Sequence, residues 1–389
     1  MPDEIKVLIV EDEDDQVEIY KDAITEHNEV ERNLNIEVSY AKTYEDAMKY
    51  IEEQVYDSAF IDLCLDKNSM DEKRGKELIS YIKTHAKYPI YIVSGSLDDD
   101  TAKLAENKFI SEYERGSQDV SLDLLLDEVE ALYKTGITRV LNAEGFFAKH
   151  LHEIFWKHFS QSKDYWLENH LLDGTELEKS ISRYALSHLY EYLEISEQGN
   201  TVKYDVSEMY IYPIIKQKIS PGDVVTLNNE YQLVMTPACD LAQQTNNIIF
   251  VKLNKFLSLS DIIDKRDKYK TALDALQKES SEDTIKNEAK NKEAVKNLLR
   301  NYISNNKGNR YHFLPNFLEF EAHTVDFQLI TTISLEAANE LPRLLSITPA
   351  HFKDIQARFA SYYARQGSPD FEYGDLSSFY LEGLISPEE

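Results

Sequence analysis

Polar side chains stand at the ends of three short apolar runs in the first hundred residues. Glu11 and Asp12 follow the run 6–10, and Ser94 follows the run 90–93. Asp62 lies near the end of the run 58–63. Short buried strands that alternate with helices form a parallel sheet, and the carboxyl ends of its strands meet at one edge. Because ligands bind beyond that edge, we expect these carboxylates and the hydroxyl to gather in one site.

The same alternation over residues 1–135 predicts an α/β domain with a doubly wound, five-stranded parallel sheet. The expected strands are 6–10, 36–40, 58–63, 90–93 and 109–111, and the helices between and after them include 44–53, 75–84 and 122–133. Residues 136–200 predict a helical connector that is rich in aromatic side chains and histidines. These patterns separate an N-terminal domain from the rest of the chain.

Residues 201–389 predict an α+β output domain. A β-rich stretch over 210–251 is broken by turn residues at 221–223 and 228–229, which is typical of a small barrel of the SH3-like type. Residues 259–303 are highly charged, and two serines followed by acids at 280–283 indicate that one helix ends and another begins there. We therefore expect a charged helical hairpin inserted in this domain.

The composition limits the function. The chain carries 70 acidic against 42 basic residues, a net charge of −28, so it would repel the phosphates of DNA and anionic lipid heads. No apolar run is long enough to span a membrane. Two cysteines far apart in sequence indicate a reducing compartment, so we expect a cytoplasmic protein that binds neither DNA nor membranes.

Several short motifs of the N-terminal domain resemble the CheY-like receiver domains of two-component response regulators. The matching segments are 7–12, 60–63, Gly75 and 89–95. The resemblance implies that Asp62 accepts a phosphoryl group, that Ser94 is the switch hydroxyl and that Phe109 is the switch aromatic. It also implies a Mg²⁺ site formed by Glu11, Asp12, Asp62 and the backbone carbonyl of Cys64, because Mg²⁺ prefers oxygen ligands and neutralises oxygens on both reacting groups.

Two departures from the receiver pattern bear on this chemistry. The loop between Asp62 and Gly75 is longer than usual, and Glu112 stands where the family has a lysine at the end of the fifth strand. Reversing a unit charge about 4 Å away would cost about 2–8 kcal/mol of phosphoryl stabilisation. Lys108 or Arg115 supplies the positive charge if the alignment shifts or the loop folds back. Otherwise the domain is a pseudo-receiver that takes up no phosphoryl group.

The output domain contains a second set of candidate residues. Cys239 and Asp240 could provide a thiolate nucleophile or a metal ligand with His312 or His323 as partner, although a buried structural cysteine beside a capping aspartate is the simpler interpretation. Arg358 and Arg365 lie among aromatic residues and could contact an anion or nucleotide. The alternative, which we favour, is that they pair with the many acids of this chain.

The hypothesis that follows is a response regulator that is phosphorylated on Asp62 by a histidine kinase. Its output would be contact with a downstream effector protein or phosphoryl buffering, with no enzymatic activity beyond Mg²⁺-dependent phosphoryl acceptance and autodephosphorylation, and with a homodimer left open. The arrangement also resembles the receiver proteins of Detocs-type anti-phage phosphorelays, which implies a phosphoryl sink. The alternatives are a receiver-gated enzyme with a nucleotide- or RNA-directed site in 201–389, and a pseudo-receiver scaffold.

Overall fold

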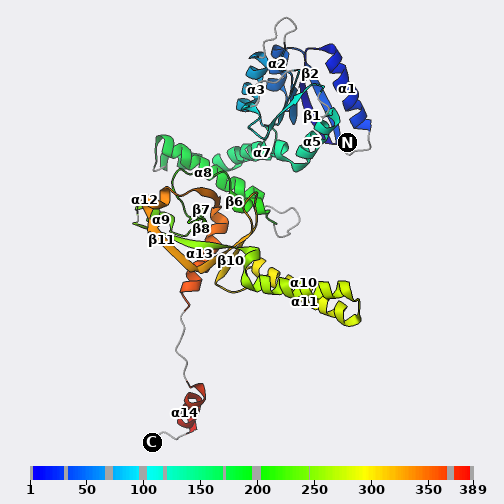
Figure 1. Cartoon of the computed structure of the whole chain (residues 1–389). Helices are drawn as coiled ribbons and strands as arrows, with labels where there is room; N and C mark the ends of the chain where they lie inside the picture. The colour runs from blue at the N-terminus through cyan, green and yellow to red at the C-terminus, as the bar shows by residue number, and fades with distance from the viewer. Residues whose placement is uncertain are drawn as a thin grey trace. The chain divides into compact units, whose positions relative to one another are not determined.

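The computed structural model describes residues 3–29, 34–65, 73–95, 103–116, 121–169, 172–194, 203–244, 246–365 and 372–385. The chain divides into two compact units, Met1–Thr201 and Val202–Glu389 (Figure 1). Each unit contains one β-sheet. Residues 66–72, which form most of the loop that the sequence predicts to be unusually long, lie outside the described residues.

The first unit is built on a five-stranded parallel sheet in the order β2-β1-β3-β4-β5. Its strands are β1 (Asp3–Val10), β2 (Leu34–Ala41), β3 (Ser58–Ile61), β4 (Ile90–Ser94) and β5 (Ile110–Glu114). The helices beside them are α1 (Asp14–Glu29), α2 (Tyr44–Glu53), α3 (Lys73–His85) and α5 (Leu122–Thr135). The observed sheet confirms the predicted fold class.

Alternate side chains of β1 pack against helices on opposite faces of the sheet. Leu8 and Val10 belong to a core cluster that includes residues of α2 and α3. Ile5, Val7 and Ile9 belong to the other cluster, which includes residues of α1 and α5. Because both faces are covered, the central strands are apolar at nearly every position, and this leaves polar groups only at the strand ends.

A run of helices follows the sheet in the first unit. Its members are α6 (Ile137–Leu141), α7 (Phe146–Glu153), the π-helical segments η1 (Ile154–Phe159) and η2 (Tyr165–Asn169), and α8 (Gly174–Leu193). The start of this run is tied to the sheet, because Thr138 Oγ1 donates a buried hydrogen bond of 3.0 Å to Asp57. Asp57 also accepts from the backbone N–H of Lys6. This anchor lies at the amino end of β3, opposite the edge that ends in Asp62.

The second unit contains a seven-stranded antiparallel sheet in the order β10-β11-β9-β8-β7-β12-β6. Its strands are β6 (Tyr210–Ile211), β7 (Asp223–Leu227), β8 (Glu230–Val234), β9 (Asn247–Lys255), β10 (Tyr311–Leu314), β11 (His323–Ser334) and β12 (Arg343–Ile347). The short helical segments η3 (Val206–Met209), α9 (Ala238–Ala242), η4 (Phe256–Ser258) and α12 (Leu335–Asn339) lie between strands. This architecture is the α+β class that the sequence predicts.

The sheet of the second unit curls so that its two edges approach each other. Tyr210 on the edge strand β6 donates a hydrogen bond of 2.7 Å to the carbonyl of Pro315, which directly follows the other edge strand, β10. The Tyr210 ring also stacks on Phe317 with 5.5 Å between ring centroids. These side-chain contacts connect the two edge strands, β6 and β10. In the described part of the sheet, no ladder of backbone hydrogen bonds joins these two strands.

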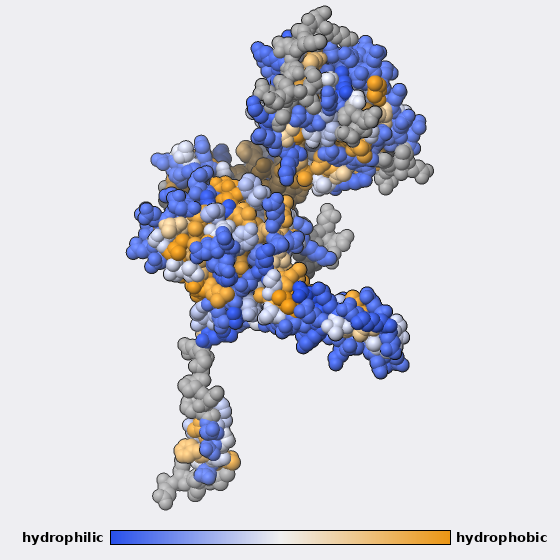
Figure 2. All heavy atoms as spheres, viewed as in Figure 1, coloured by the Kyte–Doolittle hydropathy of each residue, from blue (hydrophilic) through white to orange (hydrophobic). Residues whose placement is uncertain are grey.

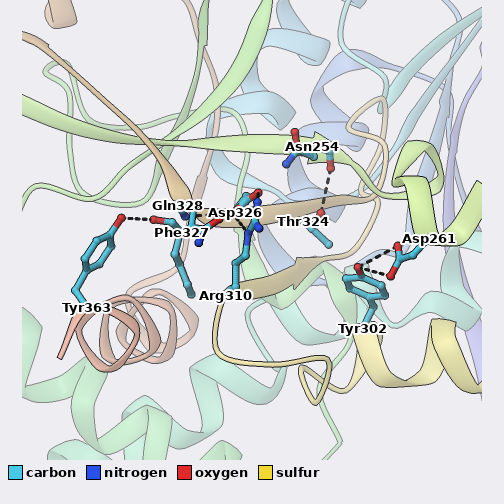
Figure 3. Close-up of polar contacts among 9 residues, drawn as sticks. All are labelled: Asn254, Asp261, Tyr302, Arg310, Thr324, Asp326, Phe327, Gln328 and Tyr363. Carbon is cyan, nitrogen blue, oxygen red and sulfur yellow. Dashed lines mark hydrogen bonds and ion pairs between the residues drawn. The ribbon is translucent and has the colours of Figure 1, made fainter. Parts of the chain in front are cut away.

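An ion pair and a tyrosine fix β11 between its neighbours (Figure 3). Arg310 donates two hydrogen bonds, of 2.7 and 2.6 Å, to the buried carboxylate of Asp326. Tyr363, at the end of α13 (Pro349–Tyr363), donates 2.7 Å to the carbonyl of Phe327. Bidentate arginine–carboxylate pairs are strong and geometrically specific. These contacts therefore hold α13 and Arg310, the residue before β10, to strand β11.

The predicted charged hairpin is present as α10 (Ser260–Lys278) and α11 (Glu282–Ile303). The two helices pack along each other and extend away from the sheet (Figure 1), with a mostly hydrophilic surface (Figure 2). Ser281 begins the second helix with a capping box shared with Thr284. At the base, Tyr302 of α11 donates to both oxygens of Asp261 of α10 (Figure 3), which ties the two helices of the hairpin together.

The remaining described helix is α14 (Tyr373–Ile385). Among the helices that the structure describes, none combines the length and the apolar character needed to cross a bilayer.

Gly75 is required by the packing of α3 against β3. A Cβ at this position would lie 2.5 Å from Leu63 Cα and 2.6 Å from its carbonyl oxygen, and backbone atoms cannot rotate away. We predict that Gly75→Ala lowers the free energy of unfolding by about 2 kcal/mol through overpacking. Urea denaturation followed by circular dichroism measures this. Gly95→Ala is the control, because its Cβ would meet nothing within 4 Å, and an equal loss in both variants would contradict the prediction.

His312 makes the stability of the second unit depend on pH. Burial lowers the pKa of the His312 imidazole to about 4, against a smaller opposing effect of Asp354. The unfolded chain, with a pKa near 6.5, binds this proton more tightly, so stability is lost as the pH falls from about 6.5 toward 4. We predict that wild type loses about 2 kcal/mol more than His312→Gln between pH 7 and pH 4.5 in urea denaturation. Equal losses would show that His312 contributes no pH dependence.

Candidate functional site

Three carboxylates from two strand ends meet at the carboxyl edge of the parallel sheet. Glu11 and Asp12 directly follow β1, and Asp62 directly follows β3, the neighbouring strand. One oxygen from each of the three lies within 4.8 Å of the others. The parallel register causes this meeting, because Val10 pairs with Ile61 and the two chains leave the sheet side by side.

Asp62 is held in place while part of its carboxylate stays unpaired. Its backbone N–H donates 2.9 Å to the carbonyl of Val10, and the side chain is only 5% exposed. Asp62 Oδ1 has no hydrogen-bond partner among the residues that the structure describes. A buried, unpaired carboxylate oxygen is costly, and in folded proteins such an atom usually has a missing partner such as an ion or a substrate.

Burial raises the pKa of the Glu11 carboxyl to about 7, and the charges of Asp62 and Asp12 act in the same direction. The backbone N–H of Glu13, which donates 3.1 Å to Glu11 Oε1, and the guanidinium of Arg115 lower it. The edge therefore holds more negative charge than its surroundings stabilise. A cation brought to these carboxylates would favour their ionised forms.

Arg115 is the positive charge that the structure places at this edge. It lies directly after β5, where its backbone N–H donates 2.9 Å to the carbonyl of Ser94. Its guanidinium contacts Glu11 Oε2, lies 3.0 Å from Asp62 Oδ2 and lies 3.6 Å from the half-exposed Glu13. Of the two basic residues considered from sequence, Arg115 reaches the acids, whereas Lys108 is exposed before β5.

The structure brings some of the other predicted site residues to the same edge. Ser94 is the last residue of β4 and is 1% exposed, so its hydroxyl lies at the carboxyl end of the strand next to β3. Cys64 lies two residues beyond Asp62 and is partly buried. The switch role of Ser94 and the ligand role of the Cys64 carbonyl stay predictions.

Phe109 does not lie at this edge, and this corrects the sequence-based placement. β5 begins at Ile110, so Phe109 stands before the strand, where its carbonyl accepts from the backbone N–H of Ile90 at the start of β4. Its ring is 47% exposed and lines a cavity of about 210 Å³ between α3 and α6. β5 ends at Glu114, three residues beyond the expected end of the strand at 111. Glu112 therefore lies inside β5, paired with Ile92.

The residues at the carboxyl edge fit a magnesium ion. Mg²⁺ binds oxygen ligands, commonly one or two carboxylates with waters, and dehydrates reluctantly. The three carboxylates offer such oxygens within 4.8 Å of one another, and the Asp62 carboxylate also has a buried oxygen, Oδ1, without a partner among the described residues. Glu11, Asp12 and Asp62 are thus the side chains that would hold the ion.

A second cluster, which the sequence analysis missed, joins α1 to α5. The buried His27 lies 3.3 Å from Glu130 through Nε2 and 4.0 Å from Asp127 through Nδ1. The two nitrogens face different carboxylates, and Glu130 also pairs with Lys134, so we interpret the cluster as an ion-pair network between helices. The spacing of His27 with Tyr20 and Ile24 on the apolar face of α1 was the available signal.

The candidate residues of the output domain contact different partners. Cys239 is exposed on α9, so the expectation of a buried cysteine is wrong, and its thiol donates a hydrogen bond of 3.4 Å to the neighbouring Asp240. His312 lies 3.7 Å from Asp354, which also pairs with Arg358 at 2.8 Å. The arginine therefore pairs with an acid of its own chain, as the simpler interpretation predicts.

A polar cavity of about 920 Å³ lies on the sheet of the second unit. His323, Tyr231 and the lysines of β9 line it, whereas Cys239 and Arg358 do not. The His323 ring is buried, stacks on Phe320 at 4.8 Å and donates from Nδ1 to the carbonyl of Glu321. These contacts support a packing role for His323, and the cavity that His323 lines does not bring Cys239 or Arg358 to it.

Comparison with known proteins identifies the first unit. Residues 7–113 match the family described as the response regulator receiver domain. The N-terminal domain is a receiver domain. The match covers the whole carboxyl edge up to β5 and stops two residues before Arg115. No curated protein matches the chain.

Three solved structures to which this chain is similar are described as response regulators or receiver domain proteins. A two-component response regulator from Clostridium difficile is 20% identical, with 33% of this chain and 96% of that chain covered and a TM-score of 0.26. A CheY-like receiver domain protein from Methanospirillum hungatei is 20% identical, with 34% and 98% covered and a TM-score of 0.27. A response regulator from Thermotoga maritima, solved in complex with Mg²⁺ and BeF, is 22% identical, with 33% and 98% covered and a TM-score of 0.26.

The contacts of Arg115 should contribute to the stability of the receiver domain. Arg115 is 19% exposed and pairs with two nearly buried carboxylates. We predict that Arg115→Gln lowers the free energy of unfolding by about 2 kcal/mol in buffer with EDTA, because hydrogen bonds to charged groups are lost. Arg74→Gln, which breaks an exposed pair with Glu45, should cost less than about 1 kcal/mol. Urea denaturation compares the two, and equal costs would contradict the prediction.

Proposed function

We propose that this chain is a response regulator that accepts a phosphoryl group on Asp62 from a phosphohistidine of a histidine kinase in the cytoplasm. The observation that carries the proposal is the gathering of Glu11, Asp12 and Asp62 at the carboxyl edge of the receiver sheet. Asp62 alone of the three combines nearly complete burial with an oxygen that has no partner among the described residues. These properties suit a nucleophile that must be positioned but not neutralised.

In the proposed reaction, Asp62 Oδ1 attacks phosphorus as the P–N bond of phosphohistidine breaks and its electron pair passes to the imidazole. Mg²⁺, when held by Glu11, Asp12, Asp62 and the carbonyl of Cys64, supplies charge neutralisation to the oxygens of both partners. Ser94, at the end of the neighbouring strand, donates a hydrogen bond to a phosphoryl oxygen. Water later hydrolyses the acyl phosphate at the same site, which returns the carboxylate.

We further propose that the output is contact with an effector protein, or storage of phosphoryl groups, rather than binding of DNA. The net charge of −28 opposes binding to a phosphate backbone. The helical run after the receiver sheet exposes large apolar side chains, each at least 48% accessible, which are common in protein interfaces: Phe155, Trp156, Tyr165, Leu167, Leu186 and Tyr190. A surface of this kind suits a protein partner.

Intact-mass spectrometry tests the phosphoryl chemistry. After incubation with Mg²⁺ and acetyl phosphate, we expect wild type to gain the mass of one phosphoryl group and Asp62→Asn to gain none, because the amide is not a nucleophile for phosphorus. Asp46→Asn, which changes an exposed aspartate on α2, is the matched control and should behave as wild type.

An adduct on Asp62→Asn would place the acceptor elsewhere. The absence of any adduct on wild type, together with no change on addition of beryllofluoride, would favour the pseudo-receiver alternative. A phosphorylated histidine kinase as donor, with effector binding measured in parallel, distinguishes a regulator from a sink. A sink removes phosphoryl groups from the kinase and leaves effector binding unchanged, whereas a regulator changes effector binding.

A further inference from the structure

Arg115 contacts the same side chains that would hold a metal ion. Its guanidinium contacts Glu11 Oε2 and lies 3.0 Å from Asp62 Oδ2. These are two of the three carboxylates whose oxygens lie within 4.8 Å of one another. A divalent cation and this guanidinium would therefore draw on two of the same carboxylates.

The two cations would oppose each other at these carboxylates. Mg²⁺ needs its ligand oxygens at about 2.0–2.1 Å in nearly octahedral geometry. A guanidinium hydrogen-bonded to the same carboxylates adds a unit positive charge a few ångströms away, and that repulsion is strong where water is scarce. Glu11 and Asp62 are 1% and 5% exposed, so solvent screens this repulsion weakly.

A third carboxylate, that of Glu13, lies near enough to receive the guanidinium. Glu13 Oε2 lies 3.6 Å from Arg115 Nη1, and the Glu13 side chain is 53% exposed. A shift toward Glu13 would keep Arg115 paired while it releases Asp62 and Glu11. Because Arg115 directly follows β5, only its side chain needs to move.

We propose that Arg115 is an internal competitor for Mg²⁺, whose guanidinium must leave Asp62 and Glu11 for Glu13 before the metal binds. The proposal rests on the proposed function, since it describes the regulation of the phosphoryl acceptor site. Arg115 is a positioning residue in this scheme: it sets the metal concentration at which Asp62 becomes competent. Anything that draws the arginine away, such as an acidic partner, would prime the site.

The test is the affinity for Mg²⁺ alone, measured by isothermal titration calorimetry on the full chain at constant ionic strength. We expect Arg115→Gln to bind Mg²⁺ at least about fivefold more tightly than wild type, because fivefold is the effect of removing a unit charge about 4 Å away in bulk water and weaker screening makes the effect larger. Arg115→Met gives the same result if the glutamine variant does not fold, and circular dichroism verifies folding of each variant.

Lys42→Gln is the matched control for a general change in charge. Lys42 directly follows β2 at the same edge, where the carbonyl of Ala41 accepts from the backbone N–H of Glu11, but its ammonium pairs with Asp14. Direct competition predicts less than a twofold change in Mg²⁺ affinity for this variant. Equal tightening in Lys42→Gln and Arg115→Gln would overturn the proposal in favour of a long-range field.

The outcomes also separate this proposal from the proposed function. Unchanged or weaker Mg²⁺ binding by Arg115→Gln, with a phosphoryl adduct still formed on wild-type Asp62, would overturn the competition and leave the acceptor role intact. No Mg²⁺ binding and no adduct in wild type or either variant would overturn both.

Discussion

The burial of several carboxylates at one edge of a parallel sheet is the constraint on which the receiver domain depends. The register of β1 with β3 places Glu11 and Asp62 side by side and takes both away from water. Burial raises the pKa of Glu11 and so makes its charge costly. The edge is therefore stable only with a cation in reach, and Arg115 at the end of β5 supplies one from within the chain.

This constraint links the chemistry to the fold. The strands contribute the acids only because a parallel sheet aligns their carboxyl ends, and the apolar cores on both faces hold that alignment. The close approach of Gly75 to Leu63 keeps the segment after β3 near the sheet. Burying these carboxylates together raises the electrostatic free energy of the site, and binding of a divalent cation would lower it.

The second unit handles its acids differently. Asp326 is buried and paired with Arg310, and Asp223 is buried beside Arg343, so in each case an arginine accompanies the acid in the fold. The α10–α11 hairpin instead mixes exposed acids with a similar number of basic side chains, so it adds little to the net charge of the chain. The net charge of −28 over the whole chain opposes the binding of nucleic acids, in line with the proposed output through contact with a protein.

The sequence by itself determined the parallel sheet, the acids at its strand ends and the charged hairpin. Each depends on local patterns, such as apolar runs, turn residues and capping serines, that leave few alternatives. The sequence placed Phe109 and Glu112 wrongly relative to the site, because nothing local shows where β5 ends. Only the tertiary structure decided this: the pairing of β5 with β4 continues to Glu114, three residues beyond the expected end, and brings Arg115, distant in sequence, onto Glu11 and Asp62.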